Sequence, residues 1–233
     1  MQFVIGGIQK TSLLDFPNKI SAIVFTKGCN FNCGYCHNPN LVKPKTQEDI
    51  YSTDVFLEFL KKRQGKLDGV VISGGEATLQ KDLIPFIKEV KELGFAVKLD
   101  TNGYLPDVLE NVINQKLVDY IAMDIKAPLD KYSLITRVNT DTSKIEKSIN
   151  LVMESGIDYE FRTTVLKSQL DYNDFEKIGK LIQGAKKYYL QKFEAKTDIL
   201  DMDLASEKTY SDAEFDEIIK ILKKYIEFAE LRK

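Results

Sequence analysis

The chain has 233 residues, of which 43% are hydrophobic and 29% charged, enough apolar residues for the core of one domain or two small ones. Its formal net charge of −2 argues against a dedicated nucleic-acid surface, because phosphate binding requires a basic excess. No apolar run approaches the roughly 18 residues of a membrane helix, and the start, MQFVIGGIQK, has no export signal. We therefore expect a cytoplasmic protein.

Strand-like runs alternate with amphipathic helical runs along the chain. The predicted strands are 20–26, 68–73, 95–100, 119–125, 158–166 and 186–193, and the helices that follow them are 53–63, 81–93, 106–115, 142–155, 173–183 and 212–225. Gly94 and Gly156 are placed to end two of these helices. Six βα units in series predict a parallel sheet with right-handed crossovers. A doubly wound open sheet and a complete or partial barrel both fit, and the pattern alone slightly favours the open sheet.

One loop holds all three cysteines and the only histidine of the chain, in the stretch KGCNFNCGYCHNP that begins at Lys27. The spacing is Cys29-x3-Cys33-x2-Cys36, with His37 directly after it. Because thiols stay reduced in the cytoplasm, three cysteines there indicate metal or redox chemistry rather than a disulfide.

Three metal centres can be weighed against this loop. A Cys3His zinc site would need the adjacent residues Cys36 and His37 to turn onto one ion, which is rare. Haem attachment would use C-x-x-C-H and leave Cys29 unexplained. A four-iron cluster normally takes four cysteines, so three would leave one iron open. Catalytic metal centres keep an open position, and the loop therefore indicates an iron–sulfur cluster with one iron facing a substrate.

The motif CxxxCxxC, with the aromatic Tyr35 before the last cysteine, resembles that of the radical S-adenosylmethionine (SAM) enzymes. In that family three cysteines hold a [4Fe-4S] cluster, and the fourth iron is chelated by the amino and carboxylate groups of SAM. An electron from the reduced cluster cleaves the sulfonium and yields a 5'-deoxyadenosyl radical. The resemblance implies that Cys29, Cys33 and Cys36 are the cluster ligands.

A narrower resemblance rests on VFTKGC and YCHN, which are similar to motifs of the activases of glycyl-radical enzymes, including pyruvate formate-lyase activase. It covers about residues 7–200, and the opening GGIQKTSLLDFPNKI is similar to that of the short activases of anaerobic ribonucleotide reductase. The resemblance implies a partial (β/α)6 barrel with a short N-terminal hairpin, and residues 1–233 as one radical SAM domain.

A barrel keeps its chemistry on the loops after its strands, and SGGEATLQ follows the second predicted strand. Gly74 and Gly75 allow backbone to approach a ligand closely, and Glu76 adds a carboxylate. This segment resembles the family's GGE motif, which receives the SAM ammonium. The alternative is a plain Gly-Gly turn that opens a helix.

Two acidic residues, Asp100 and Asp124, end the next two predicted strands, so we expect them at the same height in a parallel sheet. Two such carboxylates repel unless one is protonated or a cation lies between them. The resemblance implies a Na+ or K+ site at Asp100, Thr101 and Asp124, with the backbone of Ala122. The alternative is two separate acids that cap helices.

The resemblance also implies further SAM contacts beside the cluster and on the later strands. These are Tyr35, Cys36, His37 (through its backbone, to the adenine), Asn102, Lys126 (to the SAM carboxylate), Arg162, Thr164 and Val165. At the sixth strand end, Glu194 stands near the place of a histidine in pyruvate formate-lyase activases, which leaves the ribose contact open.

The expected reaction is reductive cleavage of SAM followed by removal of a hydrogen atom from a glycine Cα of a partner glycyl-radical enzyme, with anaerobic ribonucleotide reductase as the first candidate. Flavodoxin or ferredoxin is the expected electron donor. Two alternatives stay open: a radical SAM enzyme that acts on a small molecule, and a non-catalytic metal-binding module.

Overall fold

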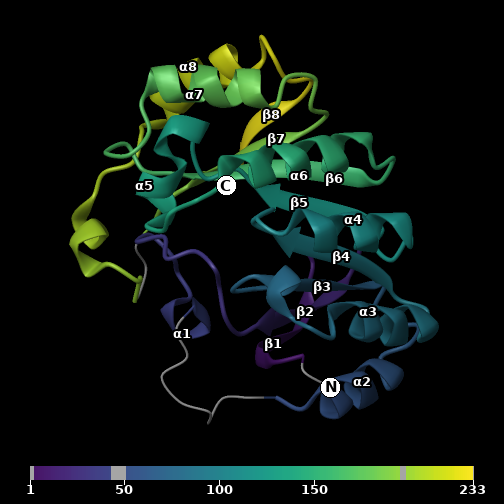
Figure 1. The fold of residues 1–233 in the computed structure, drawn as a ribbon. Helices are drawn as coiled ribbons and strands as arrows, with labels where there is room; N and C mark the ends of the chain where they lie inside the picture. Colours follow the sequence, from purple (N-terminus) through teal and green to yellow (C-terminus); the bar gives the residue numbers. More distant parts are fainter. Residues whose placement is uncertain (1–2, 43–50, 195–197, 233) are drawn as a thin grey trace.

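The computed structural model describes residues 3–42, 51–194 and 198–232. Its eight strands form one sheet in sequence order, which Figure 1 shows from β1 at the lower edge to β8 near the top. The strands are β1 (Ile5–Ser12), β2 (Ser21–Thr26), β3 (Gly69–Gly74), β4 (Ala96–Thr101), β5 (Tyr120–Asp124), β6 (Asp158–Val165), β7 (Tyr188–Lys192) and β8 (Ala229–Arg232).

Helices connect the parallel strands. The α-helices are α1 (Pro39–Val42), α2 (Thr53–Lys61), α3 (Leu83–Glu92), α4 (Pro106–Asn114), α5 (Tyr132–Thr136), α6 (Thr142–Glu154), α7 (Tyr172–Leu181) and α8 (Asp212–Leu222). The same described ranges contain three short 3-10 helices, η1 (Ala77–Leu79), η2 (Leu129–Lys131) and η3 (Met202–Ser206). Gly94 and Gly156 follow α3 and α6 with φ of +88° and +71°, a conformation that ends a helix, as predicted.

The pairing confirms the predicted α/β fold. β1 is antiparallel to β2 and forms the N-terminal hairpin, and every later neighbouring pair is parallel. Within the described ranges, β1 and β8 each pair with one neighbouring strand, so the sheet stays open. The sequence prediction missed β8, because its four residues, AELR, are too short to show a period.

The side of the sheet that faces the helices is apolar. Val97 and Leu99 of β4, Ile121 of β5 and Phe161 of β6 are 0% exposed and belong to one core cluster. Helix residues such as Phe86 of α3 complete that cluster. Alternation along each strand sends the neighbouring residues to the opposite, concave side.

The loop of the N-terminal hairpin covers the concave side at the amino ends of the strands, where Phe16 lies against Gly69. Phe16 is 3% exposed and packs in a small separate cluster with Ile23, Val71 and Tyr120. Its ring lies 6.2 Å from that of Tyr120. This apolar cluster fills the concave side at the amino ends of the strands, so polar side chains of that side gather at the carboxyl ends of β2 to β6.

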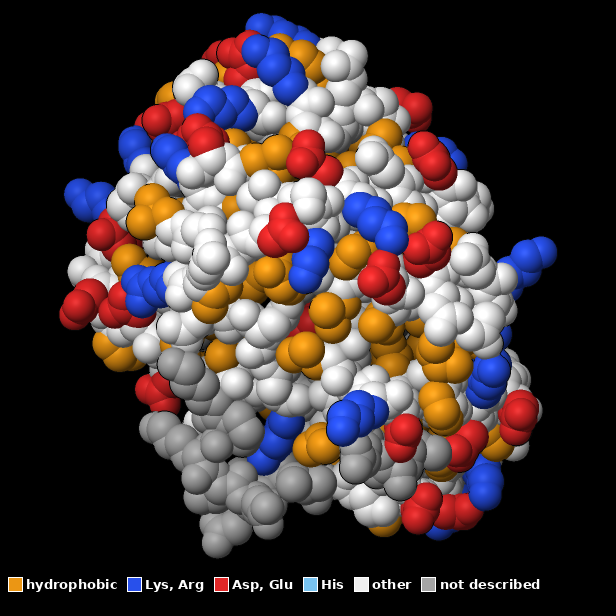
Figure 2. Space-filling model, viewed as in Figure 1, with side chains coloured by type: hydrophobic (Ala, Val, Ile, Leu, Met, Phe, Trp, Pro, Cys, Tyr) orange, Lys and Arg blue, Asp and Glu red, His pale blue; other side chains and the backbone are white. Residues whose placement is uncertain are grey.

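The surface has mixed charge. On the face shown in Figure 2, Lys and Arg side chains are interspersed with Asp and Glu rather than gathered into one patch. No helix within the described ranges is long and apolar enough to cross a membrane.

Candidate active site

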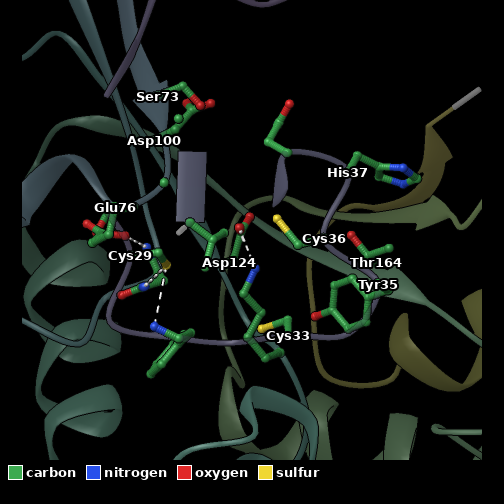
Figure 3. A pocket seen from close by; sticks show the side chains of 18 of the residues that line it. Cys29, Cys33, Tyr35, Cys36, His37, Ser73, Glu76, Asp100, Asp124 and Thr164 are labelled. Carbon is green, nitrogen blue, oxygen red and sulfur yellow. Dashed lines mark hydrogen bonds and ion pairs between the residues drawn. The ribbon is translucent and has the colours of Figure 1, made fainter. Parts of the chain in front are cut away.

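A cavity of about 200 Å³ lies at the carboxyl ends of the strands, between the cysteine loop and the sheet (Figure 3). Apart from Ala122, Val165 and Glu194, the residues that the sequence analysis named for the cluster, the cation and SAM all line it. They are Cys29, Cys33, Tyr35, Cys36, His37, Gly74, Gly75, Glu76, Asp100, Thr101, Asn102, Asp124, Lys126, Arg162 and Thr164.

Gly74 and Gly75 bring the end of β3 against the start of the cysteine loop. Gly75 donates its N–H to the Thr26 carbonyl at 2.9 Å, and Glu76 donates to the Gly28 carbonyl at 2.8 Å. A Cβ on Gly75 would lie 2.1 Å from the Gly28 oxygen, and Gly74 has φ +120°. The close approach of a ligand to these glycines stays a prediction, and both line the cavity. Their missing side chains also admit the chain's own backbone, which fixes the loop to the sheet.

The three thiols face this cavity and are free of disulfides. The Phe31 N–H lies 3.4 Å from the Cys29 sulfur and the Asn102 amide 3.9 Å from it, so both can donate to that sulfur. Burial raises the pKa of Cys29 to about 12 and also raises the pKa of Cys33. Both groups therefore favour the neutral thiol until a metal supplies compensating charge.

The donor set fits an iron–sulfur cluster. Figure 3 places Cys29 across the cavity from Cys33 and Cys36. In the described part of the chain, no three His, Cys, Asp or Glu side chains are already arranged to hold a metal ion, so the thiols share a cavity without being drawn together. Three soft sulfur ligands with backbone and amide N–H donors nearby are what such clusters use, and three ligands leave one iron open.

Glu76 is a buried organising residue, 1% exposed. Its Oε1 accepts hydrogen bonds from Thr78 and from the Thr101 hydroxyl at 2.7 Å, and its Oε2 accepts from the Asn102 N–H at 2.7 Å. Burial raises the pKa of this carboxyl, although the hydrogen bonds oppose that shift. Glu76 thus ties the end of β3 to the loop after β4, and one carboxylate oxygen keeps capacity for another donor.

A row of alternating charges crosses the concave side. The Lys98 ammonium contacts Asp100, Arg162 lies 3.3 Å from Asp100 and 3.0 Å from Asp124, and Lys126 lies 2.9 Å from Asp124. Burial on its own would raise the pKa of Asp124, but Lys126 and Arg162 outweigh it and lower that pKa to about 2. Arg162 and Lys98 likewise outweigh burial and lower the pKa of Asp100. Both carboxylates are therefore ionised.

The expectation that Asp100 and Asp124 lie at the same height is wrong. Asp100 stands opposite Ala122 in β5, and Asp124 stands opposite Arg162 in β6. This two-residue offset lets the Arg162 guanidinium lie between the carboxylates. The predicted repulsion is relieved by a side chain of the protein itself.

The outer rim of the cavity is aromatic. The His37 ring stacks on Phe193, with centroids 5.4 Å apart and planes 26° apart. The Tyr35 ring lies beside Cys33 in Figure 3, and the Lys126 ammonium is 6.0 Å from the centre of that ring. These contacts fix the carboxyl end of the cysteine loop above the strands.

Two residues named from the sequence at the later strands, the predicted SAM contact Val165 and the open position Glu194, do not line the cavity. Val165 was predicted nearer the adenine, but its side chain is 0% exposed in the helix-facing core, because it alternates with Thr164. Glu194 is not among the residues that line the cavity. The sequence analysis also missed four lining residues: Phe31, Asn38, Val42 and Ser73. Ser73 could have been found, since it shares the concave face of β3 with Val71.

Comparison with known sequences gives a consistent result. Residues 23–182 match the Radical SAM superfamily. A protein of Methanocaldococcus jannaschii named as a glycyl-radical enzyme activating enzyme is 38% identical over 241 residues, covering 100% of this chain and 97% of the relative. The pyruvate formate-lyase-activating enzyme of Streptococcus mutans is 32% identical over 203 residues, covering 82% of this chain and 75% of the relative.

Solved structures share the fold at low sequence identity. SuiB of Streptococcus suis superposes with a TM-score of 0.65 at 14% identity, covering 89% of this chain and 47% of that protein. A domain of the pyruvate-formate lyase-activating enzyme from Bacteroides vulgatus has a TM-score of 0.57 at 18% identity, covering 71% of this chain and 99% of the domain. The partial barrel is thus an architecture found in solved proteins.

Proposed function

Because the chain belongs to the radical SAM superfamily, and within it to the activating enzymes of glycyl-radical enzymes, we propose that its cavity binds a [4Fe-4S] cluster and SAM to place a radical on a partner protein. One observation supports this most directly: the three cysteines of the motif and all the predicted SAM contacts except Val165 come from five different segments and line one cavity.

The proposed binding roles follow from the charges of the side chains. Cys29, Cys33 and Cys36 would hold the cluster. Lys126 carries the positive charge that suits the SAM carboxylate, and Glu76 carries a carboxylate that suits the ammonium. When bound, the cluster and SAM supply the chemistry: one electron breaks the sulfonium C–S bond to give methionine and a 5'-deoxyadenosyl radical, which takes a hydrogen atom from glycine.

Asp124 positions Lys126 in this proposal, and Arg162 contacts the other carboxylate oxygen of Asp124. Lys126 has a raised pKa, since Asp124 outweighs its burial, and stays charged. A Na+ or K+ ion at Asp100, Thr101 and Asp124 is a separate part of the proposal. It would compete with Arg162 for the same carboxylate oxygens, so it predicts that SAM affinity depends on the monovalent cation present.

Two observations support a glycyl-radical enzyme as the partner: the names of the relatives and the open sheet. Relatives are named as activating enzymes, and the sheet is open between β1 and β8 in the described residues, which would leave space for a protruding loop. The first candidate is anaerobic ribonucleotide reductase, with flavodoxin or ferredoxin as the one-electron donor. The proposed compartment is the cytoplasm, where the thiols stay reduced.

The test is electron paramagnetic resonance of the reconstituted, reduced protein with SAM and a glycyl-radical protein from the same organism. A doublet signal should form on the partner, and replacing the target glycine by alanine should remove it. If no such protein acquires the signal while a small molecule accelerates SAM cleavage, the activase proposal is wrong and the small-molecule alternative holds.

A further inference from the structure

The cysteine loop depends on two segments that are distant in sequence. Residues 28–38 lie outside every helix and strand, so their position rests on contacts from elsewhere. Asn32 donates its N–H to the Thr136 carbonyl at the end of α5, at 2.8 Å. On the other side, Leu200 donates to the Cys36 carbonyl at 3.1 Å and Asp201 donates to the Gly34 carbonyl at 2.9 Å. The loop is thus held between α5 and the segment 198–206.

Gly34 marks the place where the two segments meet the loop. A Cβ on Gly34 would lie 2.6 Å from the Arg137 guanidinium carbon and 2.9 Å from Leu204 Cδ1. A side chain at this position would push the ends of the Arg137 and Leu204 side chains aside. Gly34 is therefore the point where the loop lies closest to Arg137 and to the segment 198–206.

An ion pair joins the two segments across Gly34. Arg137 follows α5 in the left-handed conformation, with φ +55°, and its guanidinium contacts the Asp201 carboxylate. The second carboxylate oxygen of Asp201 accepts a hydrogen bond from the Asp203 N–H at 3.1 Å, so Asp201 is the N-cap of η3. Asp201 therefore contacts Arg137, η3 and the cysteine loop at once.

We propose that Arg137 and Asp201 are positioning residues for the cysteine loop: their ion pair latches α5 and the segment 198–206 onto Gly34 and keeps Cys33 and Cys36 facing the cavity. The side chains are 38% and 23% exposed, so the latch is weak and weakened further by salt. A weak latch lets the loop open to receive its metal and close afterwards. The inference rests on the proposed function only for what the loop binds.

The first test uses the cluster-free protein, so that its outcome does not depend on iron binding. The rate of iodoacetamide alkylation is measured separately for each cysteine by mass spectrometry. We expect Arg137→Gln and Asp201→Asn each to raise the rate at Cys33 and Cys36 by up to about fivefold, the range of a partly exposed ion pair. The double variant should add nothing further, because either change opens the latch.

Charge reversal and a matched control complete the test. The variant Arg137→Asp/Asp201→Arg should return the rates toward those of the wild type. Lys147→Gln breaks another exposed ion pair, with Asp107 at 2.7 Å on α4 and α6, and should leave the rates unchanged. Alkylation rates equal to the wild type in the Arg137 and Asp201 variants, or raised equally by Lys147→Gln, would overturn the inference.

A second readout follows the loaded protein. Release of iron to a chelator should accelerate in Arg137→Gln by the same factor as alkylation, and high salt should accelerate it in the wild type but not in the variant. If the protein binds no iron at all, the proposed function fails while the alkylation result still decides whether the latch exists.

Discussion

The two faces of the sheet differ in polarity, since one is an apolar core and the other carries the charged cavity. Neighbouring residues on β6 show this most clearly. Phe161 faces the helices, is 0% exposed and lies 5.3 Å from the Tyr159 ring. Arg162, the next residue, faces the concave side and lies between Asp100 and Asp124. One residue serves the core and the next serves the cavity, although they share one strand and one set of backbone hydrogen bonds.

The same alternation holds on β4. Val97 and Leu99 lie in the helix-facing core, whereas Lys98 and Asp100 lie on the charged side. The difference shows that, along one strand, alternate residues form the core that stabilises the fold and the residues between them line the cavity. Substitutions on the helix-facing side should therefore change the free energy of unfolding, and substitutions on the concave side should change what the cavity binds.

The largest expected effect is on the concave side. Cys33→Ala should abolish cluster formation, lowering iron from about four per chain to near zero, because two thiolates cannot replace three. Stability of the cluster-free protein should change little. Iron analysis and thermal unfolding measure the two effects, and Ser73→Ala, which lies in the same cavity, is the matched control. Stoichiometric zinc in place of iron in the wild type would contradict the cluster assignment.

On the helix-facing side, Phe161→Ala should lower the free energy of unfolding by about 3–5 kcal/mol, since it removes a fully buried ring and leaves a cavity. Denaturant titration of the cluster-free protein measures it. The control is Phe228→Ala, because Phe228 is 41% exposed and should cost much less. Similar losses at both positions would mean that the helix-facing core is not as distinct from the surface as the burial indicates.

Asp124→Ala should weaken SAM binding by about 1–3 kcal/mol, because Lys126 loses the carboxylate that holds it. Equilibrium binding in Na+, K+ and a large organic cation measures the effect and tests the cation hypothesis. Asp107→Ala, 89% exposed on α4, is the control. A rise in affinity would instead mean that Asp124 competes with SAM for Lys126.

The smallest effect concerns pH. The folded pKa of Asp124 is about 2, against about 3.9 in an unfolded chain, so its ion pairs stabilise the fold fully above the unfolded value. That contribution should be lost as the pH falls through about 4 toward 2. Denaturant midpoints of the cluster-free protein should therefore fall more steeply across this range in the wild type than in Asp124→Asn. Parallel curves would contradict the assignment.

Much of the molecule follows from the sequence alone. Strand and helix order is local, because hydrophobic periods of 2.0 and 3.6 residues and the glycines at helix ends are readable without tertiary information. The cysteine spacing is also local and places its three ligands in one loop by chain connectivity. Residues at the carboxyl ends of successive parallel strands converge on one edge of the sheet, so Glu76, Asp100 and Asp124 could be expected near one another. The further contacts at Asn102, Lys126, Arg162 and Thr164 were expected only from the resemblance to the radical SAM enzymes.

Tertiary structure alone decided how those residues are paired. The register between β4, β5 and β6 places Arg162 between Asp100 and Asp124, and no local pattern specifies a two-residue offset between strands. The ion pair of Arg137 with Asp201 joins positions 64 residues apart. Such contacts depend on where the backbone returns in space, so composition, period and spacing determine which side chains this protein brings to its cavity, while packing determines which charge neutralises which.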